Sequence, residues 1–334
     1  MALFAVLMCV NFASCSNEND TPSTEEQEFY TVKLGWDGEI LDITEEPLSR
    51  TATADLYGIQ IYSTPNKDLA EGETPIWTAY AYGLFEDPSN ISANLLKGYK
   101  YKFVATMVKD GKNKLGAYSS PFMLVGNATT IPGTDFNYAS HPYFNGLGNG
   151  YTFTTNGQYY HFNSDRYYGE LVDYDPATSQ IATIPMKRTA FGASFVAINT
   201  VSKTGKLEIM MQSAPKMEIE FVAGEIDEFW AKDIFTFYDV AAAYATDGYT
   251  ETIPVTFNWH RDDGGTIPLG THNITYKRNR NTIVTIKIKN AGTDEAVGFS
   301  IAGTEQVEID DMEQDGNTTI EDGEIVTTPV TPTN

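Results

Sequence analysis

Apolar and polar residues alternate along most of the chain with the period of two that is typical of half-buried β-strands. The clearest example runs from residue 99 to residue 107, where aromatic and aliphatic side chains occupy every second position and lysines stand between several of them. The same pattern predicts strands in six further stretches, at residues 30–36, 57–61, 217–221, 253–259, 284–288 and 297–301. The alternation therefore predicts a chain built mainly from strands.

Turn-forming residues and a scarcity of helical patterns favour an all-β fold. Residues 262–265 read Asp-Asp-Gly-Gly, which is typical of a hairpin turn. Only short helices are predicted. One lies at residues 240–245, where Asp239 can cap the first turn, and one at residues 90–97, which Gly98 would end.

The spacing of the strand patterns predicts two antiparallel β-sandwich domains in tandem. Residues 126–175 are rich in Gly, Asn and Tyr and have weak periodicity, and a new strand-like run begins at Ile181. We therefore expect an N-terminal sandwich at residues 29–180, a C-terminal sandwich at residues 181–310, and an acidic, Thr- and Pro-containing tail at residues 311–334.

The N-terminal end has the features of a lipoprotein signal. Residues 2–10 form an apolar run that is too short to span a bilayer as a helix, and small residues precede Cys15. We expect a signal peptide at residues 1–14, lipidation of Cys15, and an acidic tether at residues 15–28; an ordinary secretory signal with an incidental cysteine is the alternative. No basic residue precedes the run, so we expect the natural start to lie upstream. Cys9 is the only other cysteine, so the mature chain can form no internal disulfide.

Charge excludes one class of partner. The chain of 334 residues has 22 basic and 45 acidic residues, for a net charge of −23. Binding to a nucleic-acid backbone depends on clustered Lys and Arg, so we expect no nucleic-acid partner. Much of the excess acid lies in the two ends, which contain no Lys or Arg, and the body is moderately acidic.

No catalytic or metal-binding motif stands out. The four histidines have no ligand spacing, although a cross-strand pair of His260 and His272 is conceivable; the other two are His141 and His161. Asp311 and Asp315 imitate the start of a calcium loop, but Asp322 replaces the usual Glu and no helices flank the segment. We expect no cofactor, no metal site and no enzymatic activity; a hydrolase with unrecognised carboxylates is the least favoured alternative.

Aromatic residues gather in one stretch beside polar groups, and aromatic faces of this kind can stack on sugar rings. The candidate glycan platform consists of Tyr159, Tyr160, Tyr167 and Tyr168. The competing interpretation, which we prefer, is that these rings fill the contact between the two domains.

With these features together, the chain resembles the fimbrillin superfamily, the pilins and pilus-associated surface lipoproteins of Gram-negative anaerobes. The stretches that carry the resemblance are Cys15 with its acidic tether, residues 43–50 with 56–62, residues 98–105, and residues 184–190. The resemblance implies two transthyretin-like β-sandwiches. It also implies a location at the outer membrane and cell surface, with membrane contact only through the lipid.

The resemblance further implies protease-activated strand exchange. In fimbrillins a protease cuts after an arginine near the first strand, that strand is lost, and a segment of the next subunit fills the groove. Here the cut would follow Arg50. The removable strand would carry Tyr30, Val32, Leu34 and Trp36. Burial of four such side chains contributes roughly 6–12 kcal/mol, so the vacated groove would favour a donor strand.

The tail argues against simple head-to-tail polymers. Donors in polymerising members often come from the C-terminal strands, but Pro329 and Pro332 suit a central strand poorly. We therefore expect a structural or adhesive component of pili, as a tip, anchor or stand-alone subunit. Its partners would be other pilin subunits and a host or bacterial surface glycan or protein. A non-polymerising glycan-binding lipoprotein is the alternative.

Overall fold

The computed structural model describes residues 28–40, 55–114, 121–124, 128–138, 144, 147–148, 152–154, 157–199, 204–222, 228–290, 297–309, 319–321 and 324–326. The strands of the first part are β1 (Phe29–Gly38), β2 (Leu56–Pro65), β3 (Thr78–Phe85), β4 (Ser92–Leu96), β5 (Tyr99–Val108), β6 (Met123–Leu124), β7 (Ala128–Thr129), β8 (Thr152–Thr154), β9 (Gly157–Tyr159), β10 (Arg166–Tyr174) and β11 (Ile181–Arg188). Those of the second part are β12 (Ala190–Asn199), β13 (Gly205–Met211), β14 (Met217–Phe221), β15 (Glu228–Thr236), β16 (Thr250–His260), β17 (Thr266–Lys277), β18 (Arg280–Asn290), β19 (Val297–Glu308), β20 (Thr319–Glu321) and β21 (Glu324–Val326).

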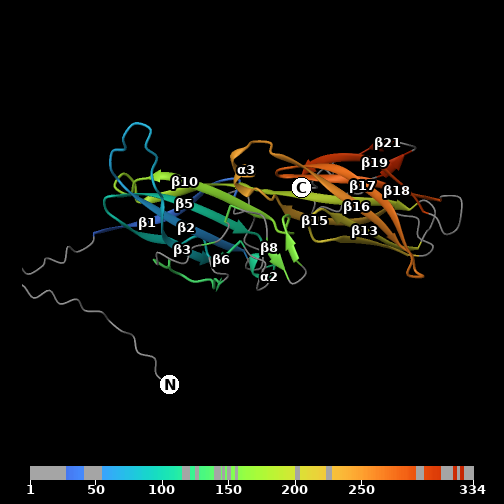
Figure 1. The fold of residues 1–334 in the computed structure, drawn as a ribbon, viewed down its shortest axis with the longest axis horizontal. Coiled ribbons are helices and arrows are strands. Elements are labelled where there is room, and N and C mark those ends of the chain that lie inside the picture. Colours follow the sequence, from blue (N-terminus) through green and yellow to red (C-terminus); the bar gives the residue numbers. More distant parts are fainter. Residues whose placement is uncertain are drawn as a thin grey trace, which may run out of the picture.

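The protein is mostly β, as its alternating pattern predicts. The described helices are α2 (Gly111–Lys114) and α3 (Val240–Ala245). The strands form two lobes that follow one another along the long axis of the molecule, with α3 between them (Figure 1). Each of the seven predicted stretches lies in a strand of the structure: β1, β2, β5, β14, β16, β18 and β19.

The first lobe is one curled sheet rather than two separate sheets. Its seven strands have the order β3-β2-β5-β10-β11-β1-β4. Side chains from all of these strands enter the same core, so the sheet wraps around its own concave face. The two end strands meet where the Tyr80 hydroxyl of β3 donates to the Asn94 carbonyl of β4 at 2.7 Å. The expectation of a two-sheet sandwich here is therefore wrong.

A second apolar layer covers the outer face of part of this sheet. It brings Val104 of β5 and Leu84 of β3 together with Phe122, with Phe144 and with Val240, which belongs to α3. Strands β2 and β5 are consequently buried on both faces, which explains the nearly continuous burial of β5 from Phe103 onward.

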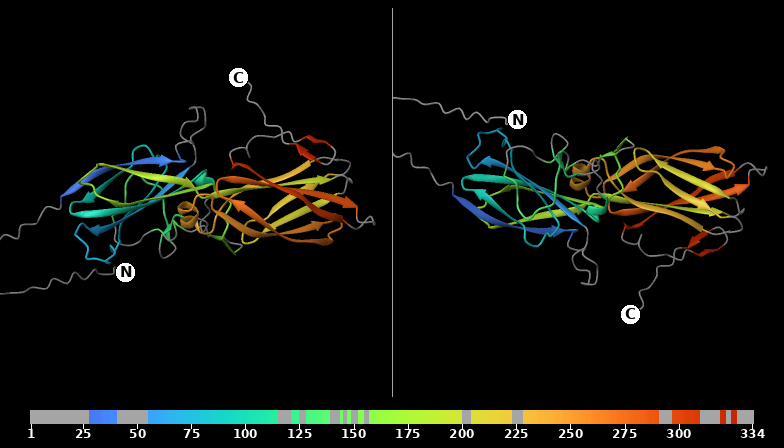
Figure 2. Two further views of the ribbon diagram at one scale, coloured as in Figure 1. Left: turned by 90° about the horizontal axis from the view of Figure 1, so that it is seen from above. Right: turned by 90° about the horizontal axis from the view of Figure 1, so that it is seen from below.

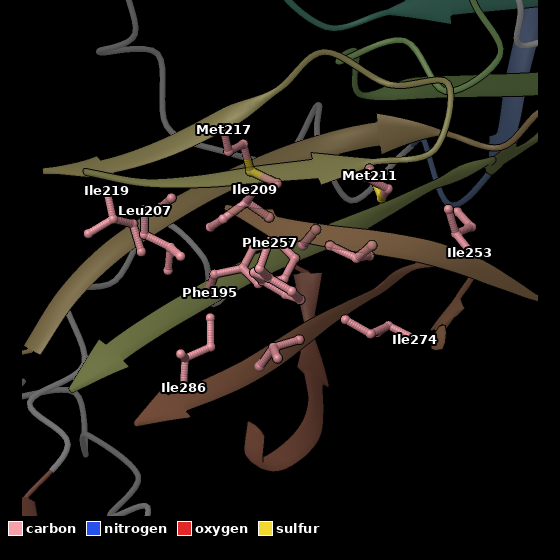
Figure 3. Packing of buried hydrophobic residues seen from close by; sticks show 14 of the residues in the cluster. Phe195, Leu207, Ile209, Met211, Met217, Ile219, Ile253, Phe257, Ile274 and Ile286 are labelled. Carbon is pink, nitrogen blue, oxygen red and sulfur yellow. The ribbon is translucent and has the colours of Figure 1, made fainter. Parts of the chain in front are cut away.

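The second lobe is a sandwich of two four-stranded sheets. Their orders are β15-β12-β18-β19 and β14-β13-β16-β17. The alternating apolar positions of both sheets point into a single core, in which Phe195 and Phe257 pack edge-to-face (Figure 3). This arrangement is what the period-two pattern predicts for a lobe whose sheets each have one buried face.

The expectation of purely antiparallel sheets is also wrong. Strand β1 pairs with β11 in parallel, and β12 pairs with β18 in parallel. In both cases the partners are far apart in sequence, which parallel pairing requires because the chain must cross over between them.

The boundary between the lobes lies later than expected. Strand β11 is hydrogen-bonded to β1 and β10 in the first sheet, so a division at Gln180 would separate neighbouring strands of one sheet. Only Thr189 separates β11 from β12, and the chain passes there from the first lobe into the second (Figure 2).

One helix prediction is confirmed and the other is wrong. Asp239 caps α3, with its carboxylate accepting from the Ala242 N–H at 2.8 Å. Residues 90–97 contain strand β4, because Ala93 and Leu95 reach the core when this segment pairs with β1.

Candidate functional site

Strand β1 is internal to its sheet although it is the first strand described. It runs parallel to β11, with Lys33 opposite Ile181 and Gly38 opposite Met186. On its other side it runs antiparallel to β4, with Phe29 opposite Leu96. We call the space that β1 fills between β11 and β4 the β1 slot.

The side chains predicted to share one face of β1 do contact one core. Val32 is fully buried and Leu34 is 2% exposed, whereas Tyr30 and Trp36 are half-buried at the edge of the same cluster. The Trp36 indole N–H donates to the Pro88 carbonyl at 3.1 Å. Burial of the two enclosed side chains, Val32 and Leu34, contributes roughly 3–6 kcal/mol to stability. This is about half of what burial of all four side chains would contribute.

The C-terminal end of β1 is held by charge and by backbone shape. Gly38 has a φ of 80°, in the left-handed region. Next to it, the Glu39 carboxylate accepts from the Arg188 backbone N–H at 2.7 Å and from Nη1 of Arg278 at 2.8 and 2.9 Å. Arg278 belongs to the second lobe, so this end of the β1 slot is built by both lobes.

A buried ion pair lies beside this end of the slot. Arg188 donates to Asp165 through Nε at 2.8 Å and through Nη2 at 2.6 Å, and both side chains are almost completely buried. Thr189 connects the lobes through its backbone: its N–H donates to Arg166 at 2.7 Å and its carbonyl accepts from Phe237 at 3.1 Å. The β1 slot therefore ends on a junction that is hydrogen-bonded to both lobes.

A separate pocket of about 400 Å³ opens on the second lobe. The exposed rings of Tyr160 and Tyr238 meet there nearly at right angles, with 5.0 Å between their centroids. The remaining lining residues are His161, Gln212, Ser213, Glu251, Thr252, Ile253 and Pro254.

The pocket contains a carboxylate whose hydrogen bonding is incomplete. Nδ1 of His161 lies 3.3 Å from the Thr236 carbonyl, and because a carbonyl can only accept, a hydrogen bond between them has Nδ1 as its donor. Nε2 of the same ring lies 3.3 Å from Oε1 of Glu251. Oε2 of Glu251 is buried and has no hydrogen-bond partner among the described residues. A ligand that donates hydrogen bonds would satisfy this oxygen.

The candidate glycan platform does not form as one surface. Tyr160 is exposed at the pocket and Tyr159 is half-buried. Tyr167 and Tyr168 are each 3% exposed and belong to the two apolar layers of the first lobe, so the expectation that they present open faces is wrong. Tyr238, which the sequence pattern does not single out, supplies the second ring. It lies just after β15, far in sequence from the aromatic stretch, and only the fold brings it to Tyr160.

Other predicted sites lie in part outside the described residues. Cys15, Arg50 and His141 are among the residues not described. His260 and His272 are not cross-strand neighbours, since their partners in the β16–β17 ladder are Thr266 and Val255.

Within the described ranges no group of three or more His, Cys, Asp or Glu is arranged to hold a metal ion. The described part of the chain also contains no helix of the length and apolarity that crossing a membrane requires.

The chain is similar over most of its length to solved structures of fimbrial proteins and candidate adhesins. The fimbrial anchor protein Mfa2 from Porphyromonas gingivalis matches with a TM-score of 0.35 and 8% identity over 83% of this chain and 97% of that chain. A candidate adhesin from Bacteroides ovatus matches with a TM-score of 0.37 and 9% identity over 78% of this chain and 88% of that chain. A candidate polysaccharide-binding protein from Bacteroides thetaiotaomicron matches with a TM-score of 0.35 and 10% identity over 84% of this chain and 99% of that chain.

The fimbrial proteins among these structures are of the class that the sequence resemblance names. The TM-scores are too low to define a fold, so the proposals below depend on the geometry of this chain. No family model matches the sequence, and no curated protein matches it.

Proposed function

We propose that the chain is a cell-surface protein of the fimbrial or adhesin class, anchored by lipid at Cys15, that accepts a β-strand from another subunit in place of β1. In this proposal its lobes are variants of the two transthyretin-like units implied by the resemblance, and it performs no catalysis. Its work is adhesion or pilus assembly at the outer surface.

The position of β1 is the observation that carries the proposal. Loss of β1 would leave the facing edges of β11 and β4 without backbone partners and would open the core at Val32 and Leu34. An extended segment can restore both sets of contacts by strand addition. Arg50 lies in the sequence between β1 and β2, so a cut after it would separate β1 from the rest of the chain.

Limited trypsin digestion of the full chain tests this proposal. We expect a new N-terminus at Thr51, after which the cut chain should take up an added peptide of residues 28–40 in place of its own β1. An Arg50→Ala variant should show neither the cut nor the uptake. A Lys67→Ala variant is the matched control, because it removes an exposed basic residue from the β2–β3 loop and should behave like the parent. Normal uptake of the peptide by the Arg50→Ala variant would contradict the proposal.

A second candidate function is glycan binding at the Tyr160–Tyr238 pocket. Two exposed rings beside a carboxylate oxygen without a partner suit a sugar, which offers both an apolar face and hydroxyl donors. A glycan array should show binding that Tyr160→Ala and Tyr238→Ala each abolish. The control is Trp230→Ala, at an exposed aromatic position elsewhere on the second lobe. Binding that survives both tyrosine changes would exclude this pocket.

A further inference from the structure

We infer that the β1 slot selects its replacement strand by a Gly-Glu pair as well as by apolar side chains, and that this strand comes from a different protein rather than from a second copy of this chain. The inference rests on the proposed function, because it names the chemistry of the strand that would occupy the slot.

The first selective position is Gly38. A Cβ added there would lie 2.6 Å from the Met186 carbonyl oxygen and 3.3 Å from the Met186 nitrogen, both of them backbone atoms of β11. The positive φ of 80° adds to this restriction, since residues with a Cβ rarely adopt it. A strand that enters in the register of β1 must therefore carry glycine at this point.

The second selective position is Glu39. Its backbone N–H donates to the Met186 carbonyl at 2.9 Å, which fixes the carboxylate beside Arg188 and Arg278. The Arg278 side chain is 9% exposed, and its Nη1 also donates to the Arg188 carbonyl at 2.9 Å. A strand without an acid here would leave a nearly buried guanidinium without its carboxylate, which is the costly way to break an ion pair.

The third requirement is for large apolar side chains on the face of the strand that meets the core. Val32 and Leu34 fill the core, Trp36 lies against Tyr57 with ring centroids 5.6 Å apart, and Ile40 is 2% exposed. The strand must run parallel to β11, as β1 does. The complete pattern is Val-x-Leu-x-Trp-x-Gly-Glu-Ile, in which the first three named positions require large apolar side chains.

The tail of this chain satisfies only half of that pattern. Residues 322–325 read Asp-Gly-Glu-Ile, the same four residues as at positions 37–40. When the two segments are superimposed on Gly-Glu, however, Val32, Leu34 and Trp36 are replaced by polar side chains: Asn317, Thr319 and Glu321. Burial of these groups without partners is unfavourable. In this structure the segments on either side of the tail's Asp-Gly pair with each other as β20 and β21. The tail of a second copy is therefore a poor donor, and the occupant that we infer is a foreign strand with both halves of the pattern.

Peptide exchange on the cut full chain tests the inference. The protein is nicked after Arg50 with trypsin, so that the fragment with β1 stays bound until it exchanges with a fluorescent peptide in excess. The peptides are residues 28–40, the same peptide with Gly38→Ala, the same peptide with Glu39→Gln, and residues 313–325. We expect the first peptide to enter, the two substituted peptides to bind at least about tenfold more weakly, and the tail peptide to remain outside.

An Arg278→Ala chain provides a second readout that does not depend on overall stability. It should take up the residue 28–40 peptide and its Glu39→Gln form with equal affinity, because the group that reads the carboxylate is gone. Persistence of the difference in that chain would overturn the assignment to Arg278.

The outcomes separate this inference from the function on which it rests. Failure of the residue 28–40 peptide to enter would remove the proposed strand acceptance, and the inference with it. Entry of all three of these peptides with equal affinity would leave strand acceptance standing and overturn the selection by Gly-Glu. Entry of the tail peptide as tightly as that of residues 28–40 would overturn the foreign donor and make a second copy the occupant.

Discussion

The buried carboxyl of Asp55 is expected to make the stability of the folded state depend on pH. Asp55 precedes β2 and is 4% exposed, and its Oδ1 accepts from the Asp110 N–H at 2.7 Å. Burial raises the pKa of this carboxyl above its ordinary value, and the hydrogen bond only partly offsets the effect. The folded state therefore holds the proton more tightly than the unfolded chain. The stability that this group contributes is present below its unfolded pKa and is lost as the pH rises through its folded pKa.

An Asp55→Asn variant should remove this dependence, because the amide keeps the acceptor oxygen but carries no charge. The free energy of unfolding of the variant, relative to the parent, should be higher at about pH 8 than at about pH 4. Urea denaturation at the two pH values measures it. Asp68→Asn, at an exposed site in the β2–β3 loop, is the control. An equal difference at both pH values would contradict the assignment to Asp55.

At the scale of elements, the curled sheet protects its open edge with tyrosine hydroxyls. On β4, the Asn94 N–H donates to the Tyr138 hydroxyl at 2.6 Å, and the Asn94 carbonyl accepts from Tyr80 at 2.7 Å. The Leu96 carbonyl accepts from Tyr101 at 2.9 Å. Backbone groups on an unpaired edge otherwise recruit strands of other chains. The tyrosines therefore direct strand addition away from this edge.

A Tyr138→Phe variant should lower the free energy of unfolding by about 1 kcal/mol, since one backbone N–H loses its acceptor. It should also increase self-association, because the freed edge of β4 can pair. Urea denaturation and light scattering measure the two effects. Tyr238→Phe in the second lobe is the control for loss of an exposed hydroxyl. Unchanged light scattering would argue against edge protection.

The elements themselves were predictable where their burial is one-sided. Strands β1, β14 and β16 follow directly from alternation, since one face meets a core and the other is more open to solvent. The helix predicted at residues 90–97 is wrong, because a segment this short contains too few apolar positions to distinguish a helical period from a strand period. Its strand state depends on pairing with β1, a segment far away in sequence.

At the scale of the whole molecule, the buried junction should make the lobes unfold together. Thr189 bonds to both lobes, and the Arg188–Asp165 pair lies beneath it. The exposed pair of Lys187 with Asp247, at 2.7 Å, joins the same strand to the residues after α3. Each pair joins one basic and one acidic side chain, but the first pair is buried and the second is exposed. Variants of the two pairs therefore compare the effect of burial on an ion pair.

An Arg188→Ala variant should lose roughly 3–5 kcal/mol of stability, because it leaves the Asp165 charge buried without its partner. Lys187→Ala should lose no more than about 1 kcal/mol, because water screens that pair. Differential scanning calorimetry should show one transition for the parent and for Lys187→Ala. Similar losses from both variants would refute the role assigned to the junction.

The sequence by itself determined the strand-rich nature of the chain, the shared face of Tyr30, Val32, Leu34 and Trp36, and the cap at Asp239, because each depends on neighbours within a few residues. Only the tertiary structure decided that β1 lies between β11 and β4, that the first lobe is one curled sheet, and that Glu39 meets Arg278. Tyr167 and Tyr168 lie in the same aromatic stretch as Tyr160, yet packing buries the first two and leaves the third exposed. These contacts join residues that are far apart in the chain, and a local pattern of side chains contains no information about which distant strand will be its neighbour.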